Sequence, residues 1–164
     1  MPELVRDLMK TDVVTAELDT SLSDLQRLFL SARVGAIPVV DHDDKLKGIA
    51  SRSDVVRKYA VEQSLAEMIE PGFDPVQGDD DDANDLRAID AIGAAVGRRL
   101  AKMCARDIMI SEVVTIGPDA TLAEAAKLML DRRIHRLPVV EAGCLIGIVS
   151  TFDFMSLYAS GSTP

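Results

Sequence analysis

The chain has 164 residues, of which 48% are apolar and 27% are charged, and its mean hydropathy is +0.13. These values exclude a disordered or fibrous chain and fit one globular domain or two small fused ones. The 27 acidic residues outnumber the 18 basic ones, which gives a net charge of −9 at pH 7. Since this charge repels phosphate backbones and anionic lipid surfaces, we expect no nucleic acid partner.

Several further functions are disfavoured by what the sequence lacks. No apolar run approaches the ~20 residues of a membrane span, and Met1–Lys10 has no export signal, so we expect a cytoplasmic protein without a membrane span. Cys104 and Cys144 lack the neighbouring ligands of a metal site. Because no catalytic motif is present either, we expect no metal site, no catalytic residue and no enzymatic activity.

An internal repeat organises the chain. Both copies contain an Arg-Asp-x-Met segment, a Val-Val-Thr segment, a Pro-Val-Val segment and a Ser-x-x-Asp segment, which begin at Arg6, Val13, Pro38 and Ser51 and again at Arg106, Val113, Pro138 and Ser150. The register slips by one residue at a polar turn, which is where loops tolerate an insertion. We therefore expect a first repeat at residues 1–60, an insert at 61–104 and a second repeat at 105–164.

Each repeat begins with the pattern of a short strand followed by a helix. β-branched residues predict the strand at Val13–Thr15 and at Val113–Ile116. The capping boxes Ser21-x-x-Asp24 and Thr121-x-x-Glu124 then predict helix starts. Behind them, apolar residues follow at helical spacing.

A hairpin and a last helix complete each repeat. The hairpin strands are predicted at Ala36–Val40 and Leu46–Ala50, and again at Leu137–Val140 and Cys144–Val149. We expect the last helix to turn its apolar residues inward, namely Val55, Val56 and Tyr59 in the first copy and Phe154, Met155 and Tyr158 in the second. The predicted fold is α/β (α+β), with two β-α-β-β-α repeats and a helical insert.

The insert between the copies has no counterpart elsewhere in the sequence. Its pattern predicts a short helix at Ser64–Glu70 that Pro71-Gly72 ends, and a longer helix over Ala83–Met103 that leads into the second copy. The run Asp79–Asp82 lacks the glycine and the closing glutamate of a calcium loop, so a solvated acidic loop is the simpler interpretation.

The two copies resemble the cystathionine-β-synthase (CBS) domain, which occurs in pairs as the Bateman module. Ile37-Pro38-Val39-Val40 and Leu137-Pro138-Val139-Val140 carry the resemblance, together with the Gly-Ile-x-Ser-x-x-Asp segments that end at Asp54 and Asp153. The resemblance implies two repeats related by a pseudo-twofold axis, with clefts between them that bind adenosine-containing ligands. It also implies a homodimer that regulates a further, unidentified protein.

The same resemblance assigns roles to matching residues of the two repeats. Asp54 and Asp153 would bind the ribose, beside Ser51 and Ser150. Thr15 and Thr115 would line the sites, and backbone groups around Ile37-Pro38 and Leu137-Pro138 would meet the adenine. A carboxylate suits the two cis hydroxyls of a ribose, but Ser-x-x-Asp is also a capping box that only starts a helix.

The repeats differ where phosphate binding needs positive charge. The second carries His135 and Arg136, whose donors match phosphate oxygens, although a solvated corner is the alternative. The first has Gly35 and Ala36 there, and Arg52 would supply a donor unless it is only a surface residue. We expect unequal sites for AMP, ADP or ATP. The alternatives are an S-adenosylmethionine or NAD sensor, and a ligand-free protein-interaction or dimerisation module.

Overall fold

The computed structural model describes residues 3–69 and 93–159. The chain divides into two compact units built from non-contiguous segments. Unit 1 comprises Met1–Leu18, Pro38–Ile49 and Ile110–Pro164, and unit 2 comprises Asp19–Ile37 and Ala50–Met109. The strands of the first repeat's hairpin continue from one unit into the other.

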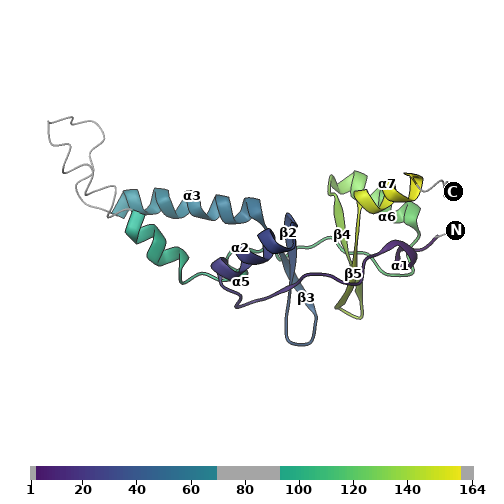
Figure 1. The fold of residues 1–164 in the computed structure, drawn as a ribbon, viewed down its shortest axis with the longest axis horizontal. Helices are drawn as coiled ribbons and strands as arrows, with labels where there is room; N and C mark the ends of the chain where they lie inside the picture. The colour runs from purple at the N-terminus through teal and green to yellow at the C-terminus, as the bar shows by residue number, and fades with distance from the viewer. Residues whose placement is uncertain (1–2, 70–92, 160–164) are drawn as a thin grey trace. The chain divides into compact units, whose positions relative to one another are not determined.

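The two repeats contain matching elements, so the mixed α/β fold class is confirmed (Figure 1). The first repeat consists of α1 (Val5–Leu8), β1 (Ala16–Glu17), α2 (Leu22–Ser31), β2 (Ala36–Val40), β3 (Leu46–Ser51) and α3 (Arg52–Ile69). The second consists of α5 (Ala105–Ile108), α6 (Leu122–Arg132), β4 (Arg136–Glu141), β5 (Cys144–Ser150) and α7 (Thr151–Ala159). Residues 93–100 are also helical.

The first strand of each repeat is shorter than predicted, and in the first repeat it also lies further along the chain. Strand β1 pairs in parallel with β2 through Ala16 and Glu17, whereas Val13–Thr15 forms no ladder. In the second repeat Ile116 alone pairs with β4, at Val139. The strand predictions at 13–15 and 113–116 were therefore wrong in extent, because β-branched residues favour extended backbone but only a partner strand makes a ladder.

The predicted helix starts of α2 and α6 are confirmed. Ser21 Oγ accepts a hydrogen bond from Asp24 N at 3.1 Å, and Thr121 Oγ1 accepts one from Glu124 N at 3.2 Å. Glu124 completes its box, because its carboxylate accepts from Thr121 N at 2.8 Å. Each box satisfies backbone donors that a helix start leaves without a partner.

Helix α3 extends into the predicted insert. The separate helix at Ser64–Glu70 was wrong, because α3 runs without a break to Ile69 and no Pro or Gly lies between Arg52 and Ile69. Of the longer helix predicted at 83–103, residues 93–100 are helical, and residues 70–92, with Pro71-Gly72 and Asp79–Asp82, lie outside the described residues.

Glu62 of α3 is buried and joins Lys58 and Arg99 in ion pairs of 3.2 Å each.

The last helices do not turn all their apolar residues inward. Val56, Tyr59 and Met155 are 69%, 50% and 69% exposed, so this expectation was wrong for them. Val55 and Phe154 are half-buried, and the side chain of Tyr158 lies outside the described part. The apolar residues of these helices therefore lie on two faces, one that is partly buried and one that is exposed.

The short helices α1 and α5 are exchanged between the repeats, which the sequence did not reveal. In unit 1, α1 of the first repeat meets the second repeat, where Val5 N donates to Ala120 O at 2.9 Å. In unit 2, α5 of the second repeat meets the first, where Ala105 N donates to Thr20 O at 2.8 Å. Val5 is fully buried in the core of unit 1, which also contains Ile116, Ala125, Met129, Leu137, Val139 and Val149.

The turn of the second hairpin contains a strained residue. Ala142 (φ +50°) and Gly143 (φ +86°) join β4 to β5, and positive φ at both positions is typical of a type I′ turn. Glycine tolerates this conformation, whereas alanine pays about 1 kcal/mol for its Cβ.

We expect Ala142→Asn to stabilise the fold by about 0.5–1 kcal/mol, because asparagine is the side chain that type I′ turns favour at this position. For a chain of this size the melting temperature should rise by about 1–4 °C, measured by differential scanning calorimetry. Ala123→Asn, on the exposed surface of α6, is the control and should give no such rise. An equal or lower melting temperature for Ala142→Asn would contradict the strain.

Candidate functional site

The candidate site of the second repeat lies where three strand segments of unit 1 meet at one edge. Strand β4 begins there, β5 ends there, and Ile116 pairs in parallel with β4. Ile116 N donates to Pro138 O at 3.1 Å, so Thr115 approaches the start of β4. Thr115 is exposed, whereas Leu137 and Pro138 are buried.

The predicted phosphate donors lie at this same edge. Arg136 is directly opposite Ser150 in the antiparallel register of β4 and β5. The carbonyl of His135 accepts a hydrogen bond from Thr151 N at 3.0 Å, which joins the loop before β4 to the start of α7. Both His135 and Arg136 are exposed, so their donors are available to a ligand.

Asp153, in the first turn of α7, is a buried carboxylate with a partner on each oxygen. It is 6% exposed. Its Oδ2 accepts from Ser150 N at 2.8 Å and from Ser150 Oγ at 2.5 Å, and Lys10 Nζ lies 3.0 Å from Oδ1. Burial acts to raise the pKa of Asp153, but the hydrogen bonds from Ser150 and Lys10 outweigh it and hold that pKa below its ordinary value.

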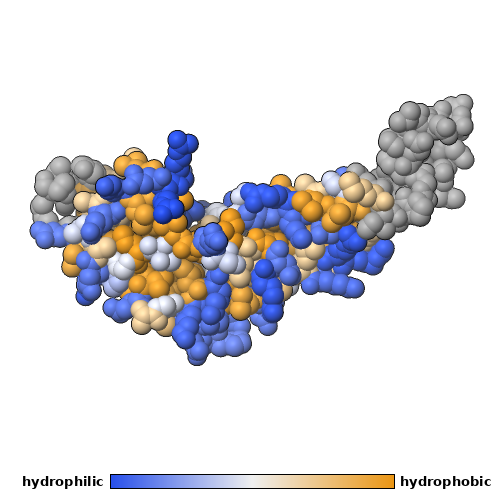
Figure 2. Space-filling view, turned by 180° about the vertical axis from the view of Figure 1, so that it is seen from behind, coloured by the Kyte–Doolittle hydropathy of each residue, from blue (hydrophilic) through white to orange (hydrophobic). Residues whose placement is uncertain are grey.

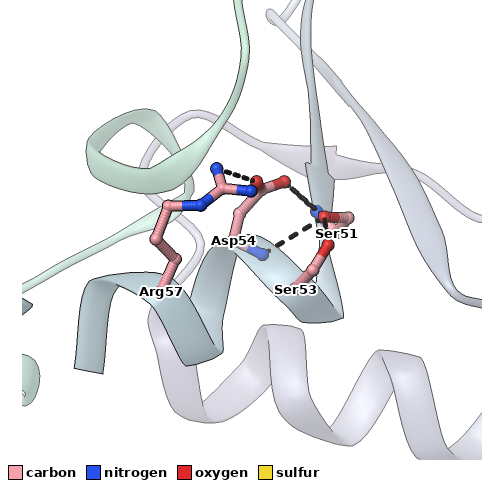
Figure 3. A network of polar contacts seen from close by, with 4 residues as sticks. All are labelled: Ser51, Ser53, Asp54 and Arg57. Atoms are coloured by element: carbon pink, nitrogen blue, oxygen red, sulfur yellow. Dashed lines mark hydrogen bonds and ion pairs between the residues drawn. The ribbon is translucent and has the colours of Figure 1, made fainter. Parts of the chain in front are cut away.

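The first repeat builds the same motif in unit 2 with a different cation (Figure 3). Asp54 is 6% exposed, and its Oδ2 accepts hydrogen bonds from the backbone N at 3.0 Å and from the hydroxyl of Ser51. Arg57, one turn further along α3, donates from Nη1 to Oδ1 at 3.1 Å. Ser51 also caps its helix, because its hydroxyl accepts from Asp54 N at 3.2 Å. In both repeats the aspartate oxygen that the serine does not engage faces a cation.

The other first-repeat candidates are distributed over both units. Arg52 donates from its guanidinium to the carbonyl of Phe29 at 3.0 Å, which commits one of its five N–H donors to the backbone. Ile37 is buried and belongs to unit 2 with Ser51, Arg52 and Asp54. Thr15, which is exposed, and Pro38, which is buried, belong to unit 1.

Two cations at these carboxylates were missed by the sequence analysis. Arg57 follows Asp54 by three residues in a predicted helix, and that spacing could have revealed it. Lys10 carried no local signal for its contact with Asp153, because the contact depends on the docking of α1 and the following segment on the second repeat.

Two repeats, each ending in a strand, a Ser-x-x-Asp turn and a helix, define a tandem-repeat module. The CBS domain model matches residues 5–61 and 105–160, and the chain belongs to this family. The uncharacterised protein MJ1426 of Methanocaldococcus jannaschii is 35% identical over 153 residues, which covers 93% of this chain and 89% of that protein.

Two solved structures share the fold. CBSX2 in complex with AMP aligns with a TM-score of 0.69 and 21% identity over 98% of both chains. The CBS domain pair of MJ0100, in complex with 5′-methylthioadenosine and S-adenosyl-L-methionine, aligns with a TM-score of 0.63 and 21% identity over 96% of this chain and 97% of that one. Across residues 3–69 and 93–159, no helix is long and apolar enough to cross a membrane.

We expect Asp153→Asn to lower the free energy of unfolding by about 1.5–3 kcal/mol at neutral pH, because charge-assisted hydrogen bonds to a buried carboxylate are lost. The folded-state pKa of Asp153 lies below its unfolded value of about 3.9. Its stabilisation is therefore complete above the unfolded pKa and is lost as the pH falls through the folded pKa.

Urea unfolding of both proteins between pH 7 and pH 2 measures this difference. The gap between the parent and Asp153→Asn should stay constant above about pH 5 and narrow below about pH 4. Asp131→Asn removes an exposed carboxylate from the last turn of α6 and serves as the control. A gap that does not change with pH would show that the charge of Asp153 contributes nothing.

Proposed function

We propose that this chain is a regulatory module that binds adenosine-containing ligands of the AMP, ADP or ATP type beside the last helix of each repeat. It performs no chemistry of its own, and ligand occupancy changes the packing of its domains, which regulates a further, unidentified protein. One observation carries the proposal: in unit 1 the buried Asp153, the hydroxyl of Ser150 and the exposed donors of Arg136 lie at one edge of the strands.

Each group at this edge suits a different part of an adenine nucleotide. Asp153 accepts hydrogen bonds, as the ribose hydroxyls require. Arg136 presents a planar set of N–H donors that matches phosphate oxygens, and His135 adds a further donor. Pro138 has no backbone N–H and its carbonyl accepts from Ile116 N, so we assign the adenine to the backbone of Leu137, beside Thr115. The first-repeat residues of unit 2, namely Ile37, Ser51, Arg52 and Asp54, form the second proposed site.

The nucleoside of the proposed ligand is better defined than the group attached to its ribose. The similar structures were solved with AMP and with 5′-methylthioadenosine and S-adenosyl-L-methionine, which share an adenosine moiety. Arg136 favours a phosphate over a sulfonium, since a guanidinium attracts anions and repels cations. S-adenosylmethionine and NAD remain the alternative ligands. The binding of S-adenosylmethionine would depend little on Arg136, and NAD would make contacts beyond it.

We expect Arg136→Ala to weaken AMP binding about tenfold to a hundredfold, because a bidentate charged contact contributes roughly 1.5–3 kcal/mol. Isothermal titration calorimetry with AMP measures the change. Arg132→Ala is the matched control, since Arg132 is an exposed arginine in the last turn of α6 and its loss changes the net charge equally.

A thermal-shift panel of AMP, ADP, ATP, NAD and S-adenosylmethionine separates the ligand classes, because a ligand that binds only the folded state raises the melting temperature. Unchanged AMP affinity in Arg136→Ala would remove its phosphate role. If no adenosine compound stabilised the parent protein, the sensor proposal would fail and a ligand-free interaction module would replace it.

We also propose that the module forms a homodimer through apolar residues left exposed on its helices. Figure 2 shows apolar residues, in orange, reaching the surface between polar ones in blue. In unit 2, Phe29, Leu30, Val55, Val56 and Tyr59 line a groove of about 370 Å³ together with Gln26 and Arg52. The second repeat exposes Leu130 and Met155 at the positions that match Leu30 and Val56. A surface repeated within one chain suits the self-complementary interface of a twofold dimer.

We expect Val56→Glu to weaken self-association about tenfold or more, because a dimer interface would bury the new carboxylate without a partner. Sedimentation velocity over a dilution series measures the monomer–dimer equilibrium. Ser64→Glu adds the same charge to an exposed position of α3 and should leave the equilibrium unchanged. A monomeric parent, or a Val56→Glu variant as dimeric as the parent, would contradict this interface.

A further inference from the structure

Lys10 contributes to the candidate site of the second repeat although it belongs to the first. Its Nζ lies 3.0 Å from Oδ1 of Asp153. The Lys10 side chain is 64% exposed, whereas that of Asp153 is 7% exposed. The pair therefore has one partner fixed in the protein interior and one at the surface, where a ligand can reach it.

Backbone contacts, and not the ion pair alone, place Lys10 at this point. Lys10 N donates to Ile148 O at 2.9 Å, and Ile148 N donates to Lys10 O at 2.9 Å. Gly147 allows this approach, because a Cβ there would lie 2.7 Å from Met9 Sδ and 3.0 Å from Lys10 O. Since Ile148 lies two residues before Ser150, this pairing holds Lys10 beside the end of β5.

The ion pair still has hydrogen-bonding capacity on both sides. Oδ2 of Asp153 is engaged twice by Ser150, whereas Oδ1 has Lys10 as its partner and can accept a second hydrogen bond. The ammonium group of Lys10 has three N–H donors, and the ion pair uses one of them. A charged donor and a charged acceptor are thus adjacent at one point of the site.

A vicinal diol matches this arrangement better than a single hydroxyl. In the proposed complex the 3′-hydroxyl would donate to Oδ1 of Asp153, and the 2′-hydroxyl would accept from Nζ of Lys10. Hydrogen bonds that involve charged groups are about twice as strong as those between neutral groups. A sugar that lacks one hydroxyl would leave one charged group without its contact.

We propose that Lys10 is a specificity-determining residue of the second site, which pairs with Asp153 to recognise the cis diol of a ribose and to reject a 2′-deoxyribose. This inference rests on the proposed function. It concerns the second site only, because Ile110 stands at the position that matches Lys10 in the other repeat and cannot donate from its side chain. In the first repeat Arg57 supplies the cation, and Ser156 stands at the matching position in α7.

The test compares AMP with 2′-deoxy-AMP in the parent and in Lys10→Met. Amide resonances of Gly147, Ser150 and Thr151 in ¹⁵N-labelled protein report on the second site separately from the first. We expect the parent to prefer AMP, and Lys10→Met to bind AMP about fivefold to twentyfold more weakly with little change for 2′-deoxy-AMP. The preference for ribose should therefore nearly disappear at this site.

Two further variants control for charge and for folding. Lys127→Met removes an exposed lysine from α6 and should keep the preference for AMP. Lys10→Arg restores a charged donor and should recover most of that preference. Because the pairing of Lys10 with Ile148 uses backbone atoms, Lys10→Met should fold normally, and a dispersed amide spectrum checks this.

The outcomes separate this inference from the proposed function. If the parent binds AMP and Lys10→Met keeps the same ratio of AMP to 2′-deoxy-AMP affinity, Lys10 has no role in specificity and the proposed function stands. Tighter AMP binding by Lys10→Met would show that the ammonium competes with the ribose, which also overturns the inference. If neither nucleotide shifts these resonances in the parent, the second-site proposal and this inference both fail.

Discussion

A carboxylate buried at the start of the last helix is the constraint on which each candidate site depends. An ionised carboxylate loses most of its hydration on burial, so it must be hydrogen-bonded and paired to remain charged. Asp54 and Asp153 meet this requirement with a serine three residues earlier in the chain. That serine engages one carboxylate oxygen, and the other oxygen faces a cation.

The two repeats pair their buried aspartates with different cations. Arg57 lies on the helix of its own aspartate, so its pairing requires no other part of the chain. Lys10 reaches Asp153 only because α1 and the segment after it dock on the second repeat. A sequence that duplicated and then diverged can therefore keep one motif twice and still give its two sites different neighbours.

Features that depend on near neighbours in the chain were predicted well. The capping boxes at Ser21 and Thr121 and the hairpins were predictable because each rests on residues close in sequence. The exposure of Val56 and Met155 was not predicted, because an apolar pattern does not distinguish buried side chains from exposed ones. The contact of Lys10 with Asp153 was not predictable either, because the repeat pattern does not say which copy a short helix joins.

The position of Lys10 also bears on how an acidic module could respond to an anionic ligand. The net charge of −9 repels such a ligand at long range, and screening confines that repulsion to about 10 Å at 0.1 M salt. Close to Asp153, however, Lys10 offsets the carboxylate, and Arg136 lies on the strand opposite Ser150. Lys10 is joined to β5 through its backbone, so under the proposed function a ligand that engages its side chain would contact the segment that docks α1 on the second repeat. The ligand can shift that docking only by the difference between its affinities for the docked and undocked states.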